Sequence, residues 1–144
     1  MSQATSVLRR NAAQSTLDKF KEQDFSFADG RDCGKMVHHN LKELGVAMPI
    51  AKVGSYKTAV GARAALRRAF GVTTLPEVMD KYFPRIPPAA ALPGDVVEVA
   101  GDGPLGTLTV ALGNGLVIAY HEDVSGAIVG RLNEAITAWR TLPL

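Results

Sequence analysis

The chain has 144 residues, enough for one domain with a sizeable core, and its content of 47% hydrophobic and 21% charged residues excludes an intrinsically disordered protein. A single cysteine excludes an internal disulfide and a multi-cysteine zinc site, and no apolar run approaches the roughly 20 residues of a membrane span. The net charge is +2, but residues 1–72 carry +6 and residues 73–144 carry −4.

The chain begins with a polar segment, residues 5–22, that is predicted to form a helix. Its main apolar positions are few: Leu8, Leu17 and Phe20. Because this pattern is only weakly amphipathic, the helix has little apolar surface for packing. We therefore expect residues 1–22 to form a polar docking arm, ahead of a domain that spans residues 23–144.

The strongest helical pattern in the chain begins at Cys33. Apolar residues follow it at offsets that place them on one stripe: Met36, Val37, Leu41 and Leu44. Asp32 stands at the N-cap position, and Gly45 stands where a helix C-terminus is usually closed. The pattern predicts a helix with one buried face that opens with a cysteine.

Two further helices complete the expected helical half, which ends at residue 83. The first covers residues 55–70, with Ser55 as its N-cap and Gly71 at its end. The second covers residues 74–83, with Thr74 as its N-cap.

The second half of the chain reads as a connector followed by strands. Residues 84–94, rich in proline and alanine, are predicted to be extended. Short alternating or apolar runs then predict the strands of an antiparallel meander: 95–99, 107–112, 116–120 and 126–129. Gly113-Asn114-Gly115 is a hairpin signal, and residues 131–139 are predicted to form a helical turn that carries Trp139. This order predicts an α+β domain in which N-terminal helices pack on a small antiparallel sheet.

Cys33 is a candidate nucleophile, because a thiol at a helix N-terminus lies at the positive end of the backbone dipole, and Arg31 is nearby. The alternative is a buried small apolar side chain. A nucleophilic thiolate also needs a base, normally a histidine. His38 and His39 project away from Cys33 on the same helix and are expected at the surface. His121, after the 116–120 run, is the one distant candidate, although an isolated histidine at a strand end is commonly structural.

Arg63, Arg67 and Arg68 form the densest cluster of basic residues and are predicted to make a basic edge on a helix. Two interpretations of the charge asymmetry remain open: the charges of the two halves mix on folding, or the molecule has a basic face that binds an anionic partner or stacks head to tail on another subunit. No nucleic-acid-binding motif surrounds the arginines. No metal-ligand spacing is found either, since His38 and His39 diverge, and no cofactor is expected.

Several short motifs occur in an order that resembles the NlpC-type papain-like cell-wall peptidases. After the cysteine and the helical half come Pro-Gly-Asp-Val-Val (93–97) and a strand that ends in Leu-Gly-Asn-Gly (112–115). Gly-Arg-Asp-Cys (30–33) and Ala-Ile-Thr-Ala-Trp-Arg (135–140) more closely resemble an NlpC-like family encoded by tailed phages, prophages and gene transfer agents. The resemblance covers roughly residues 24–140 and implies a papain-like NlpC-type fold.

In the peptidase family, the residue at Cys33 would be the nucleophile that attacks a peptide bond of peptidoglycan. The resemblance puts the family's catalytic histidine at Thr107 and its third polar residue near Ala119. Threonine cannot serve as a general base near neutral pH, because its hydroxyl has no accessible protonation equilibrium there. A shifted alignment that uses His121 would restore a dyad of Cys33 and His121.

The resemblance therefore implies a structural protein of a phage tail tip or tail assembly, located in the virion, made in the host cytoplasm, and without peptidase activity. Its expected partners are other tail proteins, namely hub and distal tail components, with no nucleic acid and no membrane span. The alternatives are an active cysteine amidase or endopeptidase that cleaves peptidoglycan during genome entry, and an assembly factor that does not persist in the particle.

Overall fold

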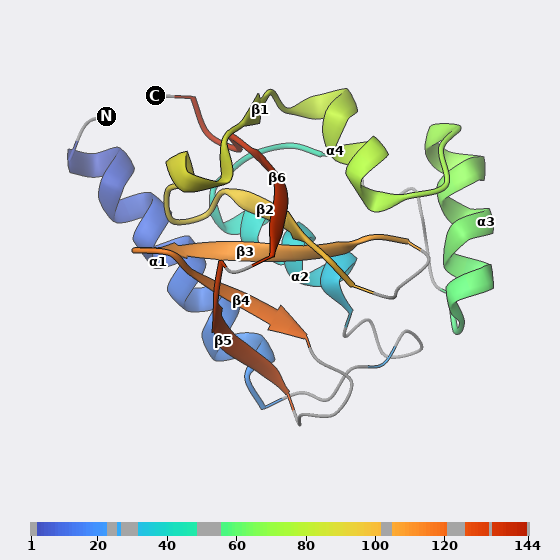
Figure 1. Cartoon of the computed structure of the whole chain (residues 1–144), viewed down its shortest axis with the longest axis horizontal. Coiled ribbons are helices and arrows are strands. Elements are labelled where there is room, and N and C mark those ends of the chain that lie inside the picture. Colours follow the sequence, from blue (N-terminus) through green and yellow to red (C-terminus); the bar gives the residue numbers. More distant parts are fainter. Residues whose placement is uncertain are drawn as a thin grey trace.

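Helices come first and most of the sheet follows in the computed structural model of the chain (Figure 1). The structure describes residues 3–22, 26, 32–48, 56–101, 105–120, 126–132 and 134–143. Within these ranges, no helix combines the length and the apolar character needed to cross a membrane. The α+β class predicted from the sequence is confirmed.

The α-helices of the described residues are α1 (Gln3–Phe20), α2 (Cys33–Glu43), α3 (Ala59–Phe70) and α4 (Leu75–Tyr82). Asp32, Thr58 and Thr74 cap the last three, and each side chain accepts a hydrogen bond from the backbone N–H three residues further on. Asp32 and Thr74 are the predicted caps. The third helix starts later than expected, because Thr58 takes the N-cap position; Ser55 lies outside the described residues.

The strands form a six-stranded sheet in the order β1-β6-β2-β3-β4-β5, and every neighbouring pair is antiparallel. Their bounds are β1 (Arg85–Ile86), β2 (Val96–Val99), β3 (Thr107–Gly113), β4 (Leu116–Tyr120), β5 (Ala127–Arg131) and β6 (Ala135–Trp139). The predicted hairpin joins β3 to β4, and Asn114 has a φ of 56°, the left-handed conformation that such turns require.

Two predictions for the second half are wrong. The expected helical turn at its end is strand β6, which lies between β1 and β2 and pairs with both. Its residues alternate between the faces of the sheet, so Ala138 and Trp139 enter different apolar clusters. The connector 84–94 is not simply extended: it contains β1 and a 3₁₀ helix, η2 (Pro88–Ala90).

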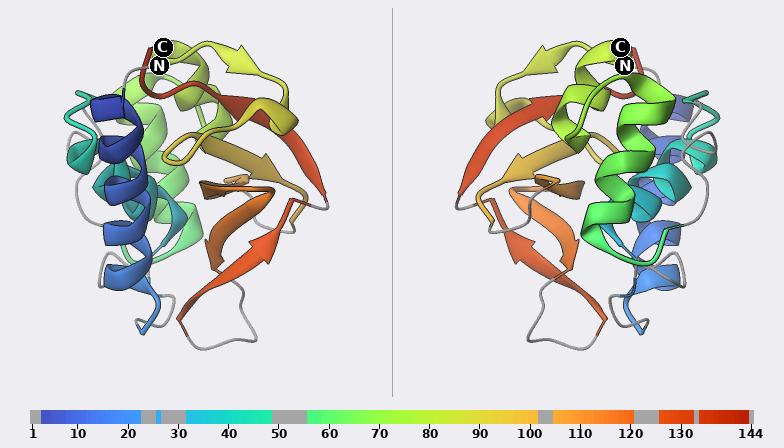
Figure 2. Two further views of the ribbon diagram at one scale, coloured as in Figure 1. Left: turned by 90° about the vertical axis from the view of Figure 1, so that its left-hand side faces the viewer. Right: turned by 90° about the vertical axis from the view of Figure 1, so that its right-hand side faces the viewer.

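The sheet has an apolar layer on each face. The helix-facing layer packs against buried residues of the helices, and its strand residues include Val96, Leu108, Val110, Ile118 and Trp139. The opposite layer is smaller and consists of Val97, Ala111, Val117 and Ala138, with partly buried neighbours. Figure 2 shows the helices on one side of the curled sheet. Most of the core therefore lies between α2 and the sheet.

Helix α1 belongs to the domain, in contrast to the expected docking arm. Although its pattern is weakly amphipathic, Arg9, Ala12, Thr16 and Phe20 are buried. Small residues and a buried arginine replace the large apolar stripe of an ordinary packing helix. Sequence hydropathy underestimates such a face, because it counts Arg9 and Thr16 as polar.

Candidate functional site

Cys33 is the first residue of α2 and lies next to its N-cap. Asp32 adopts an extended backbone and accepts a hydrogen bond from the Lys35 backbone N–H at 3.0 Å. This cap fixes the start of the helix and so places the thiol where α2 meets the sheet. The partly buried Cys33 packs against the helix-facing core, as its place in the apolar stripe predicts.

Burial raises the pKa of the Cys33 thiol to about 11. The backbone N–H of Leu108 and those at the start of α2 stabilise the thiolate, but desolvation outweighs them, and the negative charge of Asp32 also raises the pKa. The thiol is therefore protonated near neutral pH. The dipole at the helix N-terminus does not produce the activated thiolate that the sequence suggested as one possibility.

The residue of strand β3 that lies next to the Cys33 thiol is apolar. Leu108 is buried in the same core that Cys33 borders, and its backbone approaches the thiol. Thr107, which the resemblance puts at the histidine position, points to the other side of the sheet, because side chains alternate along β3 and its cross-strand partner Val99 packs against the opposite apolar layer. The backbone of Leu108 therefore lies beside the thiol, and neither Leu108 nor Thr107 has a side chain that can act as a base.

The described histidines lie elsewhere on α2. The Nε2 of His39 is 3.2 Å from Ser15 Oγ, and its ring packs edge-on to Phe20, so it belongs to the contact between α1 and α2. Burial and nearby lysines lower the pKa of both His38 and His39. Both are half-buried rather than fully at the surface. His121 lies outside the described residues, so its pairing with Cys33 stays a prediction.

Tyr56, which the sequence analysis missed, completes the polar surroundings of the thiol. Its hydroxyl donates to the Asp32 carboxylate, with distances of 3.2 and 3.1 Å to the two oxygens. Burial raises the pKa of Asp32, although this bond and the Lys35 N–H oppose it, and burial also raises the pKa of Tyr56. Nothing local in the sequence signals this pair, because the two residues are 24 positions apart.

This cluster, Asp32, Cys33 and Tyr56, offers a carboxyl group, a thiol and a phenol within one small region. It can donate and accept hydrogen bonds. Among the described residues, no histidine is among the groups that shift the pKa of the thiol. The described part of the site therefore has a nucleophile position without a base.

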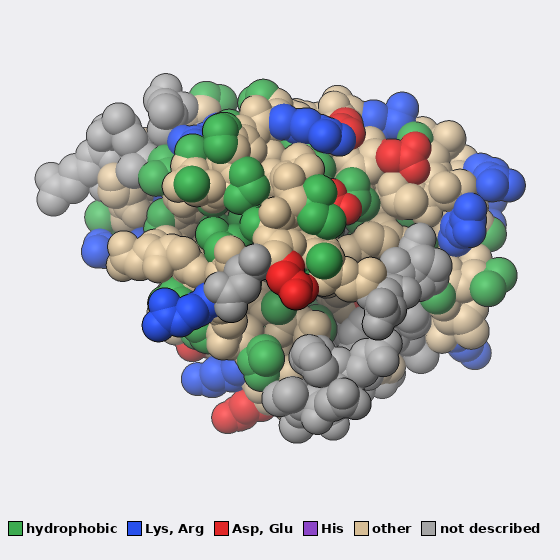
Figure 3. Space-filling model, in the orientation of Figure 1, with side chains coloured by type: hydrophobic (Ala, Val, Ile, Leu, Met, Phe, Trp, Pro, Cys, Tyr) green, Lys and Arg blue, Asp and Glu red, His purple; other side chains and the backbone are tan. Residues whose placement is uncertain are grey.

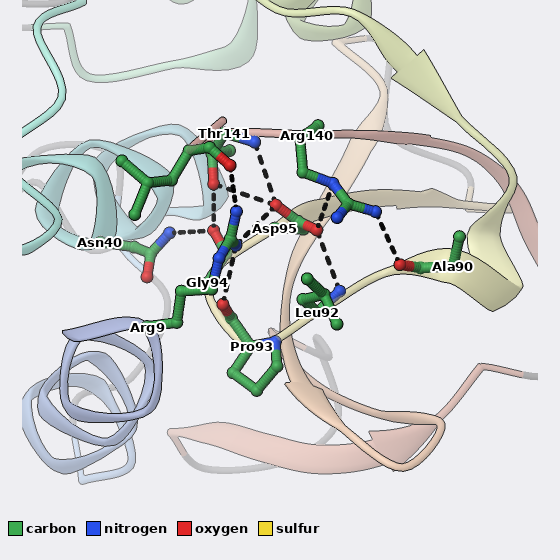
Figure 4. Close-up of polar contacts among 10 residues, drawn as sticks. Arg9, Asn40, Ala90, Leu92, Pro93, Gly94, Asp95, Arg140 and Thr141 are labelled. Atoms are coloured by element: carbon green, nitrogen blue, oxygen red, sulfur yellow. Dashed lines mark hydrogen bonds and ion pairs between the residues drawn. The ribbon is translucent and has the colours of Figure 1, made fainter. Parts of the chain in front are cut away.

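The second family-like motif, Pro93-Gly94-Asp95, forms a buried polar cluster (Figure 4). Asp95 forms an ion pair with Arg9 at 2.9 Å and with Arg140 at 3.3 Å, and neither Asp95 nor the Arg9 side chain is exposed. Its carboxylate also accepts the backbone N–H groups of Leu92 and Thr141.

Backbone carbonyls in and around this motif hold three other elements. The Gly94 carbonyl accepts from Asn40 of α2 and from the Thr141 hydroxyl. The Arg9 guanidinium of α1 donates to the carbonyls of Pro93 and Leu142. The motif therefore joins α1, α2 and the segment after β6, and its role in this chain is structural.

The predicted partner-binding arginines, Arg63, Arg67 and Arg68, are exposed on α3. None of the three forms an ion pair with the described residues. In that part of the chain, no group of three or more His, Cys, Asp or Glu side chains is arranged to hold a metal ion.

Helices packed on an antiparallel sheet, with a cysteine opening the central helix, define an NlpC-like fold. Several solved structures share this fold, and two of them are NlpC proteins. NlpC2 from Trichomonas vaginalis matches with a TM-score of 0.58 and 15% identity over 92% of this chain and 48% of that protein. NlpC1 from the same organism matches with a TM-score of 0.58 and 17% identity over 92% and 43%. The chain thus spans less than half of each.

Residues 8–141 match the model of a family described as a domain of unknown function, DUF6950, and the chain belongs to this family. A comparison with curated protein sequences finds no significant match. At 15–17% identity, the two NlpC structures establish the fold alone.

Proposed function

We propose that this chain is a non-catalytic NlpC-like domain that serves as a structural component of a bacteriophage tail tip or tail assembly, or of a phage-like particle. Its partners in this role are hub and distal tail proteins, and its location is the virion. The proposal has two parts, the loss of peptidase activity and a structural role in a phage tail. Different observations support the two parts.

The state of the Cys33 thiol supports the loss of activity. A cysteine peptidase attacks with a thiolate and needs a base to form it. Here burial keeps the thiol protonated, with a pKa of about 11, and the strand residue beside it is Leu108. An apolar side chain at this position cannot take the proton, so the scaffold keeps the nucleophile position without its chemistry.

The resemblance of two motifs supports the place in a tail. Gly-Arg-Asp-Cys (30–33) and Ala-Ile-Thr-Ala-Trp-Arg (135–140) are similar to the phage-encoded family. The second motif contributes β6, which lies between β1 and β2, so it has a structural use in this fold. Docking through α1 is limited to its exposed side, where Val7 and Leu8 are accessible, because the other side is buried.

Thiol reactivity tests the first part. Cys33 is the one cysteine of the sequence, so iodoacetamide labelling of the native chain, read at the Cys33 peptide by mass spectrometry, reports on this thiol alone. We expect labelling to rise with a midpoint near pH 11, whereas unfolded chain should show a midpoint near the ordinary value of about 8.5. A midpoint below that of the unfolded chain would overturn the proposed inactivity.

Particle analysis tests the second part. We expect mass spectrometry of purified particles to find the chain, and Cys33→Ala to assemble as well as the wild type. Particles that lack the chain would contradict the structural role and favour a transient assembly factor.

An active peptidase is the alternative that the fold itself supports, because Cys33 opens α2 as a nucleophile would. It requires His121 as the base and peptidoglycan as the substrate. A zymogram with purified cell wall separates the two: clearing by the wild type that is lost in both Cys33→Ala and His121→Ala would establish the enzyme. Clearing by neither the wild type nor the variants is the result that we expect.

A further inference from the structure

We infer that the exposed side of α3 is a docking surface for a partner protein that presents carboxylates around an apolar side chain. We call this surface the basic face and define it as Val60, Arg63, Ala64, Arg67 and Arg68. All five are exposed. The inference does not depend on whether the chain has peptidase activity.

Helix α3 has its exposed and its buried residues on opposite sides. At 100° per residue, the five residues of the basic face lie within about 140° of arc. Ala62, Ala65 and Leu66, which are buried, occupy the opposite side. Figure 2, in its right-hand view, shows α3 as the outermost element of that side of the molecule. The side chains of the basic face are therefore accessible to another molecule.

The arginines of this face differ from the other arginines near the sheet. Arg9 and Arg140 pair with Asp95, and Arg85 pairs with Asp80. Arg63 and Arg67, by contrast, are one helical turn apart, and α3 contains no acidic residue. Like charges four residues apart destabilise a helix slightly. An external carboxylate would relieve this repulsion, and the planar guanidinium can bind it through two hydrogen bonds.

The surroundings of the basic face favour a protein over nucleic acid or membrane. Val60 is 81% exposed at the start of this face, and a phosphate backbone offers it no apolar contact. Figure 3 shows basic side chains over α3 at the right-hand edge and acidic ones over the neighbouring α4, where Glu77 is exposed. A long polyanion that crossed the face would meet this negative charge. A membrane would require larger apolar side chains than Val60 and Ala64.

The geometry also specifies the partner. Arg63 and Arg67 are separated by a rise of about 6 Å along the helix, which equals the spacing of two glutamates four residues apart on a second helix. An apolar residue on that partner helix, one turn from the glutamates, would contact Val60. Arginine is enriched at protein interfaces for this combination of charge and planar surface.

The test uses the full chain and a defined probe. The probe is a fluorescent helical peptide of about 20 residues, long enough to hold a helix, with glutamates four residues apart beside a leucine. Fluorescence anisotropy measures binding, and backbone NMR shifts locate it. We expect shifts confined to α3 and its neighbours, and binding that weakens as salt rises.

Variants separate the basic face from general charge effects. Arg63→Glu with Arg67→Glu should weaken binding roughly tenfold or more. The matched control, Arg10→Glu with Arg131→Glu, makes the same charge change at exposed positions elsewhere and should change binding less than twofold. Val60→Ser should weaken peptide binding while leaving the charge unchanged. Far-UV circular dichroism verifies that all variants remain folded.

Four results would overturn the inference. The peptide could fail to bind, or it could bind the Arg63→Glu/Arg67→Glu variant as tightly as the control variant. Single-stranded DNA or vesicles of anionic phospholipid could bind α3 more tightly than the peptide does, which would assign the face to a nucleic acid or to a membrane. Insensitivity to Val60→Ser would also contradict a protein partner, because it would leave charge as the sole determinant.

Discussion

Two aspartates in family-like motifs, Asp95 and Asp32, are both buried, but different groups surround their carboxyl groups. Asp95 is buried with two arginines and two backbone N–H donors around its carboxylate. Asp32 is buried beside an uncharged phenol and a protonated thiol, and its pKa is raised. The first site compensates the buried charge with two arginines, whereas the hydrogen bonds from Tyr56 and Lys35 only partly offset the burial of Asp32. The comparison teaches that this fold surrounds the carboxylate that joins its elements with positive charge, but satisfies the carboxyl group beside the thiol mainly with hydrogen bonds.

The largest expected effect comes from the compensated site. Asp95→Ala leaves the buried Arg9 without its charge partner, so the free energy of unfolding should fall by about 3–5 kcal/mol. Urea denaturation measures it. The control is Asp18→Ala, an exposed aspartate on α1, which should change stability by less than about 0.5 kcal/mol. Equal losses in the two variants would mean that the Asp95 cluster does not stabilise the fold.

A smaller effect is expected at Asp32. Asp32→Ala removes the N-cap of α2 and the acceptor for Tyr56, and should cost about 1–2 kcal/mol. Asp32→Asn keeps an oxygen that can cap the helix and should cost less at neutral pH. If Asp32→Asn were as destabilising as Asp32→Ala, the charge rather than the cap would hold this helix start in place.

The dependence on pH should differ in sign between Asp32 and a third aspartate, Asp80. Arg85 and, to a smaller extent, Trp139 hold the pKa of Asp80 at about 2. The ionised form of Asp80 is thus favoured in the folded state, and its contribution to stability is present above about pH 4 and lost as the pH falls towards 2. The raised pKa of Asp32 has the opposite consequence: its contribution falls as the pH rises above about 4.

Difference measurements isolate these two contributions. We expect the stability of the wild type relative to Asp80→Asn to increase with pH between about 2 and 4, by less than about 1 kcal/mol because the pair is exposed. The stability of the wild type relative to Asp32→Asn should decrease with pH above about 4. Thermal unfolding followed by Trp139 fluorescence measures both. Slopes of the same sign would contradict the different environments of the two carboxyl groups.

Local sequence signals predicted the elements whose determinants are local. The N-caps Asp32 and Thr74, the stripe that begins at Cys33, and the Gly113–Gly115 hairpin all depend on residues a few positions apart. Strand β6 was missed because a five-residue run such as Ala-Ile-Thr-Ala-Trp becomes a strand only through its partners in β1 and β2, about 40 to 50 positions earlier.

The candidate site shows the same limit. Cys33 at a helix N-terminus was predictable, but its raised pKa depends on burial against the sheet and on the distant Leu108. The bond between Tyr56 and Asp32 crosses a long segment, and no spacing rule connects the two residues. The sequence of helix α1 predicts a separate arm, because an arginine counts as polar until its buried partner, Asp95, is known.

The contacts of Arg9 also determine at what point of synthesis helix α1 can pack against its final partners. Its guanidinium donates to the carbonyl of Leu142, and its charge partner Asp95 also accepts from Thr141. During translation, these bonds cannot form until residues 141 and 142 have been synthesised. Helix α1 therefore gains its full set of partners only when a segment 133 positions after Arg9 is present, and a truncation just before Thr141 would leave the helix without that attachment.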